Sequence, residues 1–242
     1  MEAAISPQLL AFLADLGSNN NRAWFEKNRN RYEEYVLRPF RMLVEDLGGF
    51  MLSIDPDLEV RPRVGGTISR IFRDTRFSRD KSPYRSTVWI VFKRPGNDWG
   101  ADAPAFFFEV TPKGYRYGMG FYSASPETMR RFREAIDRSP REFLKIARAC
   151  LKQNWLTPEG ETYKRVLAAS KPAEVQNWYQ RKSLYLVRNR PIEKRLFDPR
   201  LIDDLIRAFR LATPLYRFLW EVKTTVCSQD PPRKRVRPST PL

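Results

Sequence analysis

Residues 104–123 read PAFFFEVTPKGYRYGMGFYS, and this stretch decides the fold class. Its two halves, 104–111 and 115–123, are rich in aromatic and β-branched residues, which favours β-strands over helices. Pro112-Lys113-Gly114 between them is a turn signal. The stretch therefore predicts two neighbouring antiparallel strands, and similar runs predict further strands at 67–72, 86–93 and 183–187.

Helical patterns surround these strands. Ser6-Pro7 supplies an N-cap followed by proline at the first helical position, and Pro39 predicts a kink or break in the helix that follows. After the strands, helix starts are expected at Ser125, at Ser139 in a capping box, and at Asp198-Pro199, which opens a long terminal helix.

Together the patterns predict an α+β fold: an antiparallel sheet of about 4–6 strands flanked by N-terminal and C-terminal helices. A chain of 242 residues is short enough for one core. We assign residues 1–225 to a single domain, helical over 1–60, mainly strands over 61–123 and mainly helical over 124–225. Residues 226–242 are rich in Pro and charge without an apolar period, and we expect a disordered basic tail.

The composition excludes several classes of site. The chain has no histidine, which removes the usual general base at neutral pH and the commonest zinc ligand. Cys150 and Cys227 have no metal-type spacing, so we expect space-filling roles. No apolar run reaches the roughly 18 residues that a membrane span requires, and the N-terminus does not read as a secretory signal. We expect a cytoplasmic protein with no membrane partner, cofactor or resident metal.

Positive charge concentrates in one segment. The formal net charge is +16, and residues 61–94 hold ten Lys and Arg against only Asp74 and Asp80. This excess of eight positive charges in 34 residues suggests an anionic partner, with general solubility as the plain alternative.

Residues 73–85 form the most unusual part of that segment, a connection of about 13 residues where hairpin loops usually have two to five. The cationic side chains could grip phosphate or carboxylate. We name as anion-binding candidates Arg70, Arg73, Arg76, Arg79, Lys81, Arg85 and, on a later strand, Arg116. The alternative is a network of Arg–Asp pairs that pins a surface loop. Candidates for a catalytic role are Asp74, Asp80, Lys81 and Tyr84.

Two other features could contribute to a site. Alternation along 115–122 puts Gly118 and Gly120 on one face beside Tyr122, where they would form a flat floor for a ligand or a close-packing surface for a helix. We favour the helix. Asn20, Asn21 and Arg22 could bind an anion at a helix N-terminus, or serve only as caps.

Three stretches, 19–26, 70–84 and 117–122, resemble a widespread family of bacterial and fungal proteins designated domain of unknown function 2461. The resemblance covers roughly residues 6–222. It implies no particular activity, substrate, cofactor or catalytic residue. Its motifs fall on the 70–85 loop and on the glycine-containing strand, which implies that the two share a site.

Three functions remain open at this stage. The first is a binding module for an anionic partner, either nucleic acid or a phosphate-bearing ligand. The second is an enzyme for a phosphorylated or carboxylated substrate, with Asp74 or Asp80 as base or metal ligand and Lys81 or Tyr84 as acid. The third is a protein-interaction or structural domain. The oligomeric state does not follow from the sequence.

Overall fold

A computed structural model describes residues 5–96, 102–121 and 123–224. It confirms the α+β fold, with one five-stranded antiparallel sheet in the order β1-β2-β3-β5-β4. The strands are β1 (Val88–Phe92), β2 (Pro104–Thr111), β3 (Gly114–Phe121), β4 (Thr157–Glu159) and β5 (Tyr185–Pro191). The predicted basic tail, Tyr122 and Cys227 lie outside the described residues.

The N-terminal helices form a bent series. They are α1 (Pro7–Ser18), α2 (Arg22–Lys27), α3 (Arg29–Tyr32), a π-helical turn η1 (Glu33–Leu37) and α4 (Arg38–Ile54). Ser6 is the N-cap residue of α1 and Pro7 its first residue, as predicted. The expected break at Pro39 is present as the π-helical turn directly before it, because proline has no N–H to continue the α-helical ladder.

The remaining helices follow the hairpin. They are α5 (Pro126–Arg138), α6 (Pro140–Cys150), α7 (Ala173–Tyr179) and α8 (Leu201–Thr224), with short 3-10 turns η2 (Lys152–Asn154) and η3 (Lys194–Phe197). Ser125 caps α5 by accepting a hydrogen bond from the Thr128 N–H at 3.0 Å. Ser139 precedes α6 but makes no side-chain cap bond, so the predicted capping box is wrong.

Two strand predictions need correction. Residues 67–72 lie antiparallel to β1 but form no regular strand: they make isolated bridges, Ile68 to Ile90 and Phe72 to Tyr84. The reason is a change of partner: Ser69 N–H donates to the Trp89 carbonyl of β1 at 2.9 Å, whereas the Ile71 carbonyl accepts from the Arg85 N–H at 2.8 Å, in the returning limb of the loop. The strand expected at 183–187 instead runs over Tyr185–Pro191 as β5, and β4 was not predicted.

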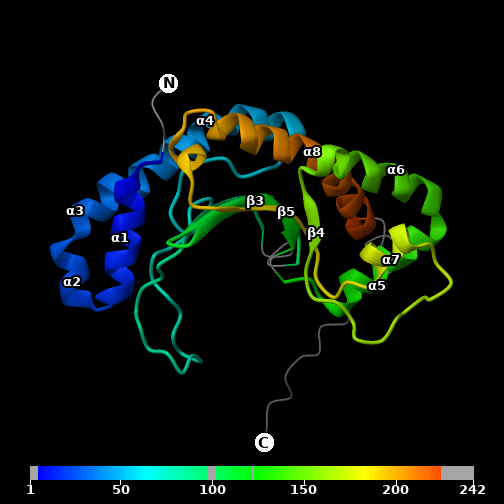
Figure 1. Cartoon of the computed structure of the whole chain (residues 1–242), viewed down its shortest axis with the longest axis horizontal. Helices are drawn as coiled ribbons and strands as arrows, with labels where there is room; N and C mark the ends of the chain where they lie inside the picture. The colour runs from blue at the N-terminus through cyan, green and yellow to red at the C-terminus, as the bar shows by residue number, and fades with distance from the viewer. Residues whose placement is uncertain (1–4, 97–101, 122, 225–242) are drawn as a thin grey trace, which may run out of the picture.

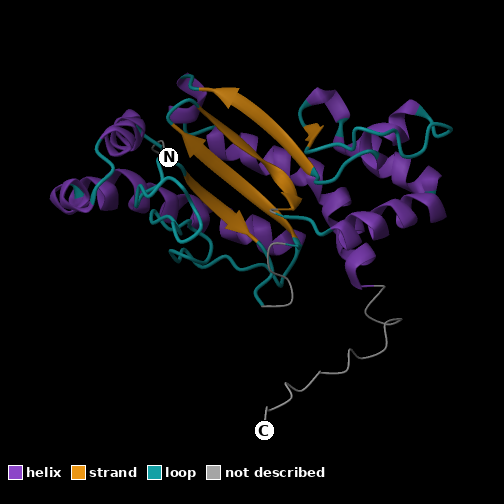
Figure 2. Ribbon diagram, turned by 90° about the horizontal axis from the view of Figure 1, so that it is seen from below, coloured by secondary structure: helices purple, strands orange, loops and turns teal. Residues whose placement is uncertain are grey.

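Among the described residues, the helices cover one face of the sheet and leave the other open. Phe106 and Phe108 of β2 point into the core, where Phe108 stacks on Phe40 of α4 at 6.0 Å and Phe106 packs on Tyr216 of α8 at 4.7 Å. The molecule is an arch, with α4 and α8 above the sheet, α1–α3 at one end and α5–α7 at the other (Figure 1). From below, the strands lie in front of the helices (Figure 2).

A buried polar cluster connects the C-terminal end of α4 to α8. Asp55 is only 3% exposed and accepts hydrogen bonds from Arg94, at 2.7 Å, and from the Tyr216 hydroxyl. Burial acts to raise the pKa of Asp55, but these hydrogen bonds outweigh it and hold the pKa below its usual range. Arg94 also lies over the Trp220 ring, 4.5 Å from its centroid. No helix in the described ranges combines the length and apolar character needed to cross a membrane.

Candidate functional site

The sheet face opposite the helices carries two large hollows. Period-two alternation explains which side chains point there: Val88, Ile90 and Phe92 are buried under the helices, so Trp89 and Val91 between them face the other way. On β2, Phe107 and Glu109 alternate in the same way with buried core residues.

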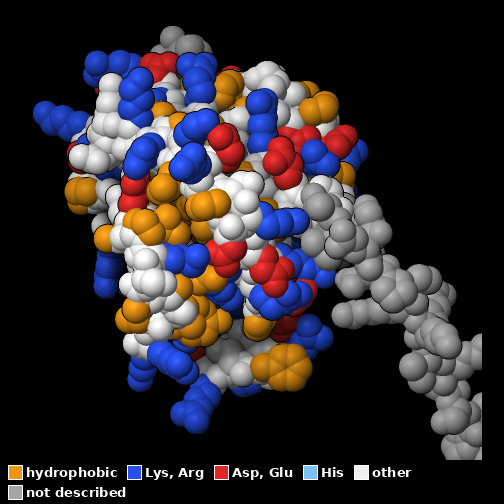
Figure 3. Space-filling view, turned by 90° about the vertical axis from the view of Figure 1, so that its right-hand side faces the viewer, with side chains coloured by type: hydrophobic (Ala, Val, Ile, Leu, Met, Phe, Trp, Pro, Cys, Tyr) orange, Lys and Arg blue, Asp and Glu red, His pale blue; other side chains and the backbone are white. Residues whose placement is uncertain are grey.

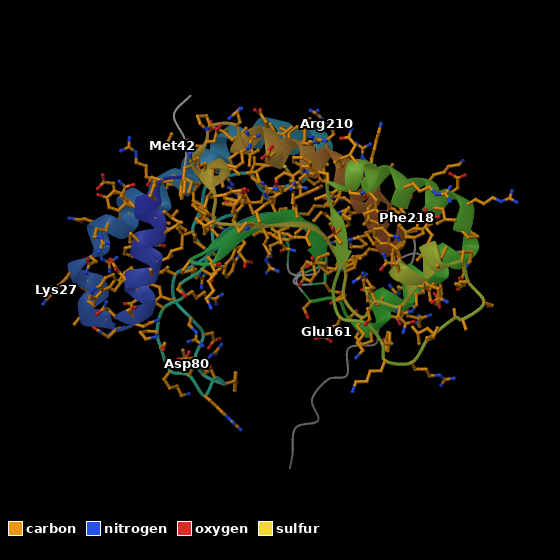
Figure 4. All side chains as sticks on the ribbon, viewed as in Figure 1. Lys27, Met42, Asp80, Glu161, Arg210 and Phe218 are labelled. Carbon is orange, nitrogen blue, oxygen red and sulfur yellow. The ribbon has the colours of Figure 1, made fainter. Side chains whose placement is uncertain are left out.

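Two adjoining cavities of about 650 and 770 Å³ occupy this face. Both are lined by Arg73, Arg85, Trp89, Val91 and Ala105, so they form one depression, which we call the open-face groove. The first cavity extends across β2 and β3 to Tyr185 on β5, and the second runs beside β1 toward Arg70 and Lys93. The loop with Asp80 descends on one side below the sheet, and Glu161 lies on the opposite side (Figure 4).

The loop beside the groove is held together by its own charges. Arg73 forms an ion pair with Asp80, whose other oxygen accepts hydrogen bonds from the Ser82 N–H at 2.9 Å and hydroxyl at 2.6 Å. Arg76 pairs with Asp74 at 2.7 Å, and Lys81 donates to the Thr75 carbonyl at 3.0 Å. The predicted Arg–Asp network is therefore present, and it uses part of the positive charge of the loop.

These contacts also bear on the catalytic candidates. Hydrogen bonds from Arg76 lower the pKa of Asp74 to about 2, and hydrogen bonds from Ser82, with the ion pair to Arg73, hold the pKa of Asp80 well below its usual range. Carboxylates with such pKa values are weak bases at neutral pH. Tyr84 is only 2% exposed, because its ring stacks on Phe25 at 4.4 Å. The four candidates do not share one cavity: Asp80 and Tyr84 line the first, Asp74 lines the second and Lys81 lines neither.

Asn20 ties the first helical hairpin to this loop. Its side-chain amide donates to the Tyr84 carbonyl and accepts from the Tyr84 N–H, each at 2.9 Å. Asn21 is the N-cap of α2, accepting from the Trp24 N–H at 2.9 Å. The amides that we considered for anion binding therefore have structural partners, and Arg22 lies exposed on the first turn of the short α2.

The anion-binding candidates fall into two groups. Arg70, Arg73, Arg76, Arg85 and Arg116 line the groove, whereas Arg79 and Lys81 line neither cavity. Arg116 pairs with Glu109 at 2.9 Å and lies 5.7 Å from the Phe107 centroid. Arg85 donates to the Phe72 carbonyl at 3.3 Å and lies over the Trp89 ring at 5.1 Å. Within the described part of the chain, Arg85 has no carboxylate partner.

The two glycines in the middle of β3 pack closely against the backbone of the neighbouring strand, and only one of them lines the groove. A Cβ on Gly118 would lie 2.0 Å from the Leu186 carbonyl oxygen, and one on Gly120 would lie 2.5 Å from that of Leu184. The close neighbour is the backbone of β5, so the helix-packing interpretation is wrong. Gly120 lines the groove, as the ligand-floor interpretation requires, but Gly118 is not among the lining residues.

Sequence reasoning missed the aromatic lining of the groove. Trp89, Phe107 and Tyr185 lie along it, and the rings of Phe107 and Tyr185 meet edge to face at 6.2 Å. Trp89 carried no usable signal, because β1 reads Val-Trp-Ile-Val-Phe and is apolar at every position. Phe107 carried none, because phenylalanines on both sides of it mask the alternation.

Positive charge is not restricted to the groove. At the end of the molecule that carries α5–α7, Lys and Arg side chains are scattered among acidic and apolar ones (Figure 3). Several of them are paired on helices, such as Arg148 with Glu174 at 2.7 Å. Across the described residues, no group of three or more Asp, Glu or Cys side chains could hold a metal ion.

The comparisons with known proteins identify one family model. The model described as "Conserved hypothetical protein (DUF2461)" matches residues 8–218, most of the chain. No curated protein matches the chain. The match spans the helical hairpin, the Arg–Asp loop, the sheet and about three quarters of α8.

Proposed function

The chain belongs to the DUF2461 family, and we propose that it is a binding module that holds a phosphate-bearing ligand in the open-face groove. The observation that carries the proposal is the charge of the lining. Six cationic side chains face three carboxylates there: Arg70, Arg73, Arg76, Arg85, Lys93 and Arg116 against Asp74, Asp80 and Glu109.

The distribution of ion pairs supports this proposal. Arg73, Arg76 and Arg116 are each paired with one of the three carboxylates. In the described ranges, Arg70, Arg85 and Lys93 have no carboxylate partner, so they keep a net positive charge on the groove. Arginine can bind phosphate through two parallel N–H donors, and the Arg85 guanidinium lies within the groove, 5.1 Å from the Trp89 ring centroid.

Binding is favoured over catalysis by the state of the carboxylates. Asp74 and Asp80 are fixed by arginines in the loop, which suits a role in orienting those arginines toward an anion. A fixed guanidinium loses less conformational entropy on binding than a free one. The loop is therefore pre-organised for an anionic ligand.

Calorimetric titration with inorganic tripolyphosphate tests the proposal. Arg85→Gln should weaken binding roughly tenfold or more, since a hydrogen bond to a charged group contributes about 1.5–3 kcal/mol. The matched control is Arg141→Gln, which removes one charge from an exposed arginine of α6 that does not line the groove.

Equal affinity of wild type, Arg85→Gln and Arg141→Gln would contradict the proposal, because general attraction to a basic protein would then explain the binding. A melting temperature should be measured for each variant. Arg85→Gln also loses the bond to the Phe72 carbonyl, and binding is to be compared only where the fold is intact.

A further inference from the structure

We propose that the ligand of the open-face groove is a single-stranded nucleic acid, whose bases stack on the aromatic side chains of the groove and of the loop tip. This inference rests on the proposed phosphate-binding function and adds the base-bearing character of the ligand. It follows from four features of the open face: its aromatic row, its Arg–aromatic pairs, its extent and the exposed tip of the loop.

The aromatic row crosses the sheet. Trp89 lies on β1, Phe107 on β2 and Tyr185 on β5, and all three line the groove. Between β2 and β5 lies β3, where Gly118 is opposite Phe107 and Gly120 is opposite Tyr185. Because glycine has no side chain, nothing on β3 stands between the two rings, which reach one another at 6.2 Å. The row spans roughly 14 Å at the ordinary strand spacing.

This arrangement suits unstacked bases. An antiparallel sheet with helices on one face and aromatic side chains on the other is a common platform on which two or three bases of single-stranded RNA stack. The bases of a duplex are stacked on one another and do not offer their faces to a protein. The aromatic row therefore favours single strands over duplexes.

Two arginines accompany the rings. Arg85 lies over Trp89 and Arg116 over Phe107, so a cation borders two of the three aromatic rings in the row. A guanidinium can stack on a base and bind a phosphate with its edge. An acidic peptide would satisfy the charges but not use the rings, and free phosphate would use neither the rings nor the length of the groove.

The tip of the loop adds a further aromatic group. Phe77 is 96% exposed, with the Arg76 guanidinium 5.9 Å from its centroid and the exposed cations Arg79 and Lys81 close by in the chain. The Arg76–Asp74 pair lies directly before this residue in the chain, and the Arg73–Asp80 pair joins the two limbs of the loop around it. A fully exposed phenylalanine among cations is suited to stack on a base next to bound phosphates.

The extent of the groove argues against a single nucleotide. Each of its two cavities alone falls within the range of 300–1,000 Å³ usual for a small-molecule site. Cationic side chains line both, from Arg70 and Lys93 at one end to Arg116 at the other. A ligand with several phosphates along its length uses both cavities, whereas one nucleotide uses one.

Fluorescence anisotropy with labelled eight-nucleotide oligonucleotides, dT and U, tests the inference on the full chain. Trp89→Leu should weaken oligonucleotide binding by about 5- to 150-fold, the effect of losing one stacked base. Phe77→Ser should weaken it by about 5-fold or more without lowering the melting temperature, because the ring is exposed. Phe77→Ser should not change the affinity for tripolyphosphate, because Phe77 does not line the groove.

The outcomes separate this inference from the proposed function. Tripolyphosphate binding that depends on Arg85, with oligonucleotide binding unaffected by Trp89→Leu and Phe77→Ser, would overturn the inference and leave the proposed function standing. Tighter binding of a duplex or of polyglutamate than of the single strand would also overturn it. If Arg85→Gln changes neither tripolyphosphate nor oligonucleotide binding, both proposals fail. The basic tail is common to all variants and does not affect the comparison.

Discussion

Replacement of Gly118 by alanine should destabilise the protein by forcing β3 and β5 apart. The added Cβ would lie 2.0 Å from the Leu186 carbonyl oxygen and 2.9 Å from the Val187 Cα. Ordinary contact begins at 3.4 Å, so the strands must separate locally by about 1.4 Å. Both obstacles are backbone atoms, which cannot rotate away as a flexible side chain can.

The size of the effect follows from what that movement disrupts. A hydrogen bond of ordinary length that is stretched by this amount is broken, and each backbone bond contributes about 0.5–1.5 kcal/mol net. Loss of two such bonds, together with an overpacking cost of about 1–3 kcal/mol, gives about 2–6 kcal/mol in the free energy of unfolding. This is a large part of the stability of a typical domain.

Urea denaturation measures this effect, and Gly49→Ala is the matched control. Gly49 is exposed within α4, and nothing lies within 4 Å of an added Cβ. Alanine should therefore stabilise the helix there by about 0.5–1 kcal/mol. Replacement of glycine by alanine is thus expected to raise the stability of the protein at Gly49 and to lower it at Gly118. A Gly118→Ala protein within about 1 kcal/mol of wild type, at an unchanged denaturant slope, would refute the reasoning.

Two further predictions concern Asn20, which anchors the loop, and the buried tyrosines. Asn20→Ala removes both hydrogen bonds to the Tyr84 backbone and should lower the free energy of unfolding by about 1–3 kcal/mol. Hydrogen exchange at the Tyr84 amide should become faster, and an unchanged exchange rate would contradict the anchoring role. Burial raises the pKa of Tyr32 and Tyr115 from 10.0 to about 12, so the contribution of these two tyrosines to stability should be constant below pH 10 and be lost as pH rises toward 12. Urea midpoints at pH 9, 10 and 11 measure this fall, and Tyr115→Phe should make it shallower; a flat profile would exclude the effect.

Local signals in the sequence were sufficient for most elements of the fold. The strand at 104–111 was predicted with its observed bounds, because aromatic residues and a flanking turn act at short range. Ser-Pro pairs located the first residues of α1, α5 and α6. β4 could not be found in this way, since it has three residues and a proline at its centre.

The sequence predicted less of the candidate site than of the fold, because the site depends on contacts between parts of the chain that are far apart in sequence. The loop at 73–85 and its Arg–Asp pairs follow from charge and length, which are visible in the sequence. The packing of α4 and α8 decides which face of the sheet stays uncovered. This packing joins distant parts of the chain, so local sequence patterns do not reveal it. Trp89, Phe107 and Tyr185 become one lining only after the face is known. The anchoring of Tyr84 by Asn20, 64 positions away, is equally invisible to local pattern.

The short outer strand β4 has a consequence for how copies of this protein meet. It has three residues, and Pro158 at its centre has no N–H to donate, so this margin of the sheet offers little to a further strand. Edge-to-edge growth of the sheet, the usual route from a folded β-protein to a fibril, is discouraged there. The open-face groove can therefore remain available to a ligand while the β4 edge of the sheet resists pairing with other copies of the protein.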